Sequence, residues 1–283
     1  MRQLADISRE RDTMSTMVEL TEAFEGIASM RIAQVKDQTQ RSAKFFAELW
    51  GIYNQIRVDE LFHFGRGQSV ANPVNKELLI FVTSEGSFSG DLDERLIKKA
   101  LQYYRPDRND IIVIGHHGAI QLVQNGVFYV RNFKMPERNN NINVTPIVKE
   151  VLNYVSTKVY YQQYISLMDQ VISELKLANA VMDRGKAIAK PDEVISEQNY
   201  IFEPSTYAVV DHLERSMMQI TLSEVILESK LAQYASRFRA MTMASDKANE
   251  SFSDATVLYN QAKRHLKDER LKEVMNGLRE GSI

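Results

Sequence analysis

The sequence predicts an α/β domain inserted between two long terminal helices that pair as an antiparallel coiled coil. Three observations carry this fold class. Residues 205–276 contain neither Gly nor Pro, residues 2–57 contain no Pro, and short apolar runs separated by turn residues lie between them. One helix of about seventy residues is on the order of 100 Å long, which is more than a small domain covers. The two ends are therefore natural partners.

The C-terminal helix carries a seam with alternating three- and four-residue spacing. Such a seam stays on one side of a helix only when the helix winds around a partner, which indicates a coiled coil. Ser245 is the one position in the series that is neither apolar nor aromatic. The residues predicted to form the coiled-coil seam include Leu231, Phe238, Met241, Ala248, Phe252, Tyr259, Ala262 and Leu266.

The N-terminal helix, residues 2–57, has a similar but narrower seam. Its positions are Leu4, Ile7, Met14, Val18, Ala28, Ile32 and Val35, with polar interruptions at Arg11, Thr21 and Glu25. A second apolar stripe departs from this seam and consists of Met17, Leu20, Phe24 and Ile27. Such a shift is expected because the 3.6-residue period of an α-helix differs from the 3.5-residue period of a coiled-coil seam. Gly26 costs a helix about 1 kcal/mol relative to Ala, which predicts close packing of a neighbouring backbone there.

The middle of the chain alternates strand and helix signals. Residues 77–83 and 110–115 are apolar runs typical of strands buried on both faces, and residues 93–104 form an amphipathic helix between them. Strand, helix and strand at this spacing predict a right-handed parallel unit. An irregular connection is then expected over residues 125–146, followed by a helix over 145–156, strands near 158–168 and 169–178, and a short strand at 200–202. The predicted division is a shaft, residues 1–57 and 205–283, and a Rossmann-like domain, residues 58–204.

Composition narrows the functional classes. A net charge of −2 argues against a strongly basic nucleic-acid binder, and the absence of cysteine excludes disulfides and thiolate metal sites. The apolar runs are far shorter than the roughly 20 residues of a membrane span, and Met1–Glu10 has no apolar signal core. We expect a soluble cytoplasmic protein that does not insert into the membrane.

Two features suggest chemistry and are interpreted as structural. The loop Ser84–Asp91 follows a strand and precedes a helix, where backbone N–H groups can bind phosphate, but it lacks a P-loop or dinucleotide pattern and carries two carboxylates. His116 and His117 follow the second strand, where extended backbone would point them to opposite faces and prevent them from sharing a metal. We predict no catalytic, cofactor-binding or metal-binding residues in this chain.

The C-terminal helix resembles the closing helix of the gamma subunit of F-type ATP synthases. The residues that carry the resemblance are Glu228-Ser229, Ala235, Arg237, Ala240-Met241, Ala244-Ser245, Ala248-Asn249-Glu250 and Leu258-Tyr259-Asn260. Three other segments agree in order: Thr21 to Ala28 with the first helix, Thr83-Ser84 and Gly90 with the strand and glycine loop, and residues 200–204 with the entry to the last helix. The chain is therefore identified as a divergent member of this family.

The resemblance implies a central-stalk rotor. Family members form a coiled-coil shaft inside an alpha-beta hexamer and couple its rotation to ion translocation through a membrane c-ring, with the α/β domain near the epsilon subunit. It implies that ATP, ADP and Mg²⁺ bind to the partner subunits rather than to this chain, and that the chain lies at the cytoplasmic face of the membrane. The positions expected to contact the alpha-beta ring are Lys263, Arg264, Asp268, Glu25 and Ile27.

Two other readings remain open from the residues alone. The chain could be a stand-alone α/β nucleotide-binding protein that dimerises through its helices, in which case bulky residues at Gly86 and Gly90 would abolish binding. It could also be a coiled-coil scaffold for unrelated partners. A stoichiometry of one copy per three alpha-beta pairs, measured by native mass spectrometry, would distinguish the rotor from the scaffold.

Overall fold

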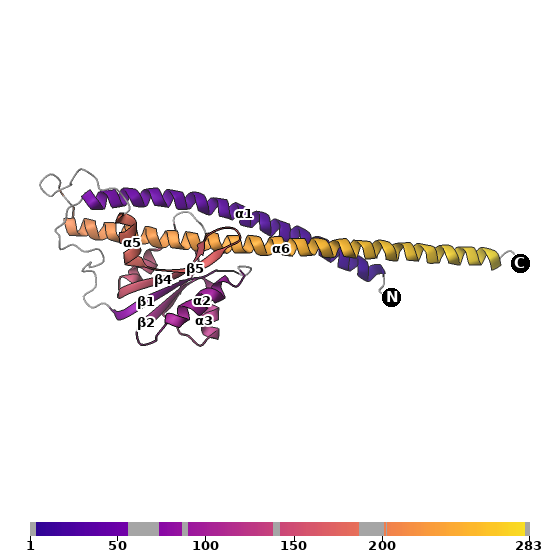
Figure 1. Ribbon diagram of the computed structural model, residues 1–283, viewed down its shortest axis with the longest axis horizontal. Helices are drawn as coiled ribbons and strands as arrows, with labels where there is room; N and C mark the ends of the chain where they lie inside the picture. Colours follow the sequence, from indigo (N-terminus) through magenta and orange to yellow (C-terminus); the bar gives the residue numbers. More distant parts are fainter. Residues whose placement is uncertain are drawn as a thin grey trace. The chain divides into compact units, whose positions relative to one another are not determined.

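The computed structural model describes residues 4–55, 74–86, 90–137, 142–186, 201 and 203–280. The chain forms two compact units, which are considered one at a time. One unit combines Met1–Ala28 with Phe238–Ile283, and the other is Ser29–Arg237. Helix α1 spans Leu4–Gln55 and helix α6 spans Thr206–Glu280, so each of these helices contributes to both units (Figure 1).

The larger unit contains a five-stranded mixed sheet with the order β3-β2-β1-β4-β5. Its strands are β1 (Val74–Val82), β2 (Asn109–Ile114), β3 (Arg131–Phe133), β4 (Tyr154–Tyr164) and β5 (Gln170–Lys176). Only β5 is antiparallel to its neighbour. The helices between them are α2 (Leu92–Tyr103), α3 (His116–Gln124), α4 (Thr145–Val151) and α5 (Leu177–Lys186). The predicted parallel strand-helix-strand unit is confirmed by β1, α2 and β2.

Alternate residues of the central strands point into two different cores. Leu79 and Phe81 pack on one face with residues of α2 and α3, where the rings of Phe81 and Tyr160 meet edge-on at 5.7 Å. Leu78 and Ile80 pack on the other face with residues of α4, α5, α1 and α6. The sheet is covered on both faces, which explains why its central strands are continuous apolar runs rather than alternating ones.

The long helices run in opposite directions within the larger unit. Near the end of α1, the hydroxyl of Tyr53 donates a hydrogen bond to Glu214 at 3.3 Å. Further back along α1, the positive charge of Arg31 acts on Lys230, which lies further forward along α6. Phe46 and Trp50 of α1 belong to the same buried core as several residues of α6. This arrangement agrees with the predicted antiparallel pairing.

The structure differs from the expected elements at several places. Residues 116–124 form helix α3, where the sequence predicted no helix, and β3 lies within the segment expected to be irregular. Helix α4 ends at Val151 rather than near 156, because Tyr154 and the β-branched residues after it join β4 instead. The short strand expected at 200–202 lies largely outside the described residues, and Ile201 is in no strand.

Gly26 does not mark close packing. A Cβ atom built at this position would have no neighbouring atom within 4 Å apart from the helix itself, and the residue is exposed. The prediction of a close backbone contact there is therefore wrong. The position is an open surface of α1.

Candidate functional site

The centre of the candidate site is the carboxylate of Asp93, which is 1% exposed at the start of α2. It accepts hydrogen bonds from the backbone N–H of Ser84 at 3.1 Å and from the Ser84 hydroxyl. The side-chain amide of Gln162 donates to it at 2.7 Å, and Nδ1 of His117 lies 2.8 Å away. A buried carboxylate is costly unless it is well hydrogen-bonded, and this one has several partners.

Gln162 connects this carboxylate to the long helix α6. Its side-chain oxygen accepts a hydrogen bond from the hydroxyl of Ser229 and a longer one, 3.4 Å, from Gln233. Gln233 also donates to the Ser229 hydroxyl at 3.1 Å. All three side chains are buried. We call Ser84, Asp93, Gln162, Ser229 and Gln233 the polar junction; it joins the α/β domain to one defined position along α6.

The polar junction lies at the carboxyl ends of β1 and β4. The connections from these two strands leave in opposite directions, and ligands of open α/β sheets bind at such switch points. Here α6 approaches this edge instead. Gly90 has a φ of +65°, and a Cβ atom built on it would lie 3.2 Å from Oγ of Ser236 on α6. The glycine of the loop therefore permits close contact with a helix, which supports the structural interpretation over the nucleotide-binding one.

A second set of contacts joins α6 to the segment after β3. The ammonium group of Lys230, which is 3% exposed, donates to the carbonyl of Pro136 at 2.7 Å. Burial, with a smaller contribution from the charge of Arg31, lowers the pKa of Lys230 to about 8. The same segment after β3 also contacts the loop after β1, where Glu85 accepts a hydrogen bond from the backbone N–H of Met135 at 3.0 Å. One of the two carboxylates in the glycine loop thus has a structural role.

The two histidines lie on α3, not on extended backbone as expected, and Gly115 is responsible for the change of direction. Gly115 has a φ of +104°, and a Cβ atom there would lie 2.3 Å from the carbonyl oxygen of Thr83. His117 contacts Asp93 and His116 is exposed. Among the described residues, no group of three or more His, Cys, Asp or Glu side chains is arranged to hold a metal ion.

The smaller unit contains most of the predicted seam. Met241 and Ala248 are buried, Phe238, Phe252, Tyr259 and Ala262 are half-buried, and Leu266 is 37% exposed; Leu231, in the larger unit, is buried. The guanidinium group of Arg11 lies 4.5 Å from the ring centroid of Tyr259, which brings α1 against α6 in this unit. The polar residues of the α1 seam, Arg11 and Thr21 among them, are half-buried or buried along with the apolar ones.

The residues expected to contact a surrounding ring fall into two groups. Lys263, Arg264 and Asp268 are exposed on α6 beyond the contact with Arg11. Ile27 is 51% exposed on α1, whereas Glu25 is half-buried in line with the seam. Ile27 belongs to the stripe of Met17, Leu20, Phe24 and Ile27, whose members are between 44% and 53% exposed. About half of the surface of this apolar stripe of α1 is therefore exposed.

Sequence reasoning did not find the polar junction. Asp93 was expected to begin a helix, and Gln162 was expected only as part of a strand. A signal was present, because Gln162 directly follows the apolar and aromatic residues 159–161, and Ser229 and Gln233 are spaced four residues apart on α6. What the sequence does not contain is the contact between these segments.

Long antiparallel helices with an α/β domain joined to one of them are the architecture of a stalk-type protein. The sequence model of the family described as ATP synthase matches residues 3–279, and the chain belongs to this family. Among its relatives are the ATP synthase gamma chains of Chloroherpeton thalassium and Clostridium novyi, which are 24% and 23% identical to it. The first alignment covers 98% of this chain and 97% of the relative, and the second covers 97% and 96%.

Solved structures share the fold. A chain in the structure of the Euglena gracilis mitochondrial ATP synthase containing OSCP, F1 and the c-ring aligns with a TM-score of 0.63 and 13% identity, covering 97% of this chain and 94% of that one. A chain in the central stalk and c-ring structure from Tetrahymena thermophila aligns with a TM-score of 0.58 and 15% identity, covering 80% and 99%. Among the described residues, no helix is both long and apolar enough to cross a membrane.

Proposed function

We propose that this chain is the gamma-type rotor of an F-type ATP synthase, the central stalk that couples rotation within the alpha-beta hexamer to ion movement through the membrane c-ring. The observation that carries the proposal is the combination of paired terminal helices with a domain joined to α6 by the buried polar junction. A shaft transmits torque only if the part that is driven cannot slip along or around it. Buried hydrogen bonds at one position of α6 supply that constraint in the larger unit.

The shaft acts by presenting different faces to identical sites. A ring of three alpha-beta pairs is symmetric, whereas a single two-helix shaft is not, so each catalytic site meets a different surface and is held in a different conformation. Changing the population of a site from 1:99 to 99:1 takes about 5.5 kcal/mol of differential contact energy. The half-exposed stripe of Met17, Leu20, Phe24 and Ile27 provides apolar contact area, and Lys263, Arg264 and Asp268 provide charged contacts.

The chain itself is a non-catalytic subunit. In this proposal ATP, ADP and Mg²⁺ bind to the alpha and beta subunits, and no cofactor binds here. The larger unit meets the epsilon subunit and the c-ring, and the complex places the chain peripherally at the cytoplasmic face of the membrane. The near-neutral net charge of −2 gives no support to a nucleic-acid partner.

The test is to place charge in the shaft. Phe252 and Tyr259 are half-buried on α6, and replacing both with Asp puts two carboxylates where the helices meet. ATP-driven ion pumping by membrane vesicles carrying the assembled complex should be lost, while Ser253→Asp, an exposed neighbour, should pump normally. Normal pumping by the Phe252→Asp/Tyr259→Asp variant would count against the rotor, as would ATP hydrolysis by the isolated chain.

A further inference from the structure

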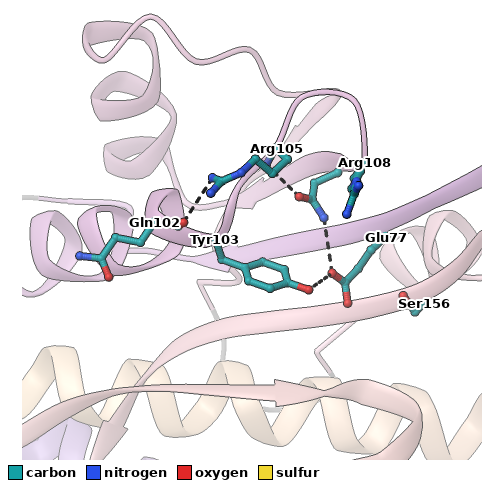
Figure 2. A pocket seen from close by; sticks show the side chains of 7 residues that line it. Glu77, Gln102, Tyr103, Arg105, Arg108 and Ser156 are labelled. Carbon is teal, nitrogen blue, oxygen red and sulfur yellow. Dashed lines mark hydrogen bonds between the residues drawn. The ribbon is translucent and has the colours of Figure 1, made fainter.

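A hollow of about 450 Å³ lies at the end of the sheet opposite the polar junction, where β1 and β2 begin (Figure 2). Its walls come from the end of α2, the turn that follows it and the first residues of the strands. Arg105 and Arg108 bring two guanidinium groups to it, and Gln102 and Ser156 add neutral polar groups. This surface is not used by the coupling mechanism described above.

The acidic residue of the hollow already has partners. The hydroxyl of Tyr103 donates to Glu77 at 2.8 Å, and the side-chain amide of Asn109 donates to the same oxygen at 3.4 Å (Figure 2). The hydrogen bond to Glu77 raises the pKa of Tyr103, so the tyrosine remains a donor. The lining thus has two guanidinium groups and one carboxylate, and that carboxylate is turned toward its own neighbours.

The two arginines retain donors for a ligand. Nη1 of Arg105 donates to the carbonyl of Tyr104 at 2.8 Å and, more weakly, to that of Gln102 at 3.4 Å, which holds the side chain at the end of α2. Its Nε and Nη2 make neither of these bonds. Arg108 is 82% exposed and forms an ion pair through its Nε with the exposed carboxylate of Asp107 at 3.6 Å, which is longer than a normal hydrogen bond. A guanidinium group matches the geometry of a carboxylate, with two parallel hydrogen bonds.

A second, larger hollow continues the first. It has a volume of about 740 Å³, lies between α2 and α3, and is lined in part by Leu101, Gln121 and Gln124. It also has one carboxylate, Glu94, and one ammonium group, Lys98, so the positive charge of the joined hollows comes from the arginine end. Gln102 lines both hollows, so the two are adjacent. The second hollow supplies side-chain amides, which pair with peptide groups, beside an aliphatic wall. A small free anion would need only the arginine end, whereas the joined hollows suit an extended ligand.

We propose that the joined hollows dock an acidic peptide segment of another subunit of the complex, with its Asp or Glu side chains on Arg105 and Arg108 and its backbone along Gln102 and the groove between α2 and α3. This inference rests on the proposed function, since it takes the partner from the assembled ATP synthase. The docked subunit would turn together with this domain, because the surface belongs to the same unit as the polar junction.

The test uses a zero-length carbodiimide, which joins an amine only to a carboxylate that it touches. The Arg108→Lys variant in the purified, assembled complex should cross-link from position 108 to an Asp or Glu of another subunit, identified by mass spectrometry. Wild-type complex, which has no amine at 108, should not form this product. Arg131→Lys, a 55% exposed position on β3 outside the hollows, is the matched control and should not reach the same segment.

The contribution of the two arginine charges to docking is tested by reversing their sign. Arg105→Glu combined with Arg108→Glu should weaken retention of the cross-linked subunit at least tenfold in competition with wild type. A complex that pumps normally but gives no link from position 108, or links only to this chain or a second copy of it, overturns this inference and leaves the rotor intact. Phenylglyoxal modifies exposed arginines, and a docked peptide should protect both of them in the assembled complex. If inorganic phosphate protects them but assembly does not, the docking inference is also overturned. A wild-type chain that joins no complex would contradict the rotor instead.

Discussion

The side-chain amide of Gln162 donates a 2.7 Å hydrogen bond to Asp93, and these two residues are 0% and 1% exposed. One belongs to β4 and the other to the start of α2, and the same Gln162 accepts a hydrogen bond from Ser229 of α6. A single glutamine thus uses its donor on the domain and its acceptor on the long helix. Because both of its ends are buried, sliding α6 past the sheet would leave polar groups unpaired.

Gln162→Leu should destabilise the larger unit by about 3 kcal/mol, because Asp93 loses a donor and Ser229 loses its acceptor in a buried site. Trp50 is the only tryptophan of the chain and is 7% exposed in the core of this unit, so its fluorescence reports the urea unfolding transition. Gln124→Leu, the same change at an exposed position of α3, should alter stability by less than about 0.5 kcal/mol. Equal effects of the two changes would show that the junction contributes nothing.

The glycines of the domain should differ sharply in their tolerance of a methyl group. Gly115→Ala places a Cβ atom 2.3 Å from a backbone oxygen of Thr83 at a φ of +104°, so we expect a loss of about 3 kcal/mol. Gly86→Ala meets nothing within 4 Å and should be close to neutral. The measurement is the same unfolding transition followed at Trp50. Similar stabilities for the two variants would contradict the described turn into α3.

The elements that the sequence predicted well are those with a long, uninterrupted pattern. The seam of α6 and the runs that became β1 and β2 each reflect burial of many residues on one side or both, and periodicity records that directly. The sequence did not predict helix α3, because this helix is short and begins directly after β2, where Gly115 turns the chain. Strand β3 was not predicted either, because it has three residues, two of them exposed, and so shows no hydrophobic periodicity.

The polar junction could not be predicted for a different reason. Asp93 and Gln162 are 69 residues apart, and Gln162 and Ser229 are 67 apart, so their contact depends on how the sheet and α6 pack. A polar residue that becomes buried needs a hydrogen-bond partner, but the sequence does not say which partner. The seam of α6, by contrast, could be predicted because its periodicity indicates a partner helix without specifying individual contacts.

Lys230 gives the larger unit a characteristic pH dependence. Its pKa is lowered to about 8 in the folded chain, below its ordinary value of 10.5, so the unfolded chain binds more protons between those two values. The free energy of unfolding should therefore rise as pH increases from about 8 toward 10.5, as the buried ammonium loses its charge. Below about pH 8 the cost of burying the charge is fully present.

The comparison that isolates this effect is with Lys230→Met, which keeps an unbranched side chain and removes the charge. Urea unfolding of both proteins, followed at Trp50 between pH 7.5 and 9.5, should show the difference in unfolding free energy moving in favour of the wild type as pH increases. Other titrating groups are common to both proteins and cancel. A difference that is constant with pH would mean that Lys230 is not desolvated in the folded chain.

Gly26→Ala should stabilise α1 in the smaller unit, because the added methyl group has open space around it and Ala is favoured over Gly in a helix by about 1 kcal/mol. Ala23→Gly, also at an exposed position of α1, is the matched reverse change. Amide hydrogen exchange of peptides around these positions should slow about fivefold in Gly26→Ala and accelerate by a similar factor in Ala23→Gly. Faster exchange in Gly26→Ala would require a neighbour that the methyl group displaces, and would restore the close contact that the sequence alone suggested.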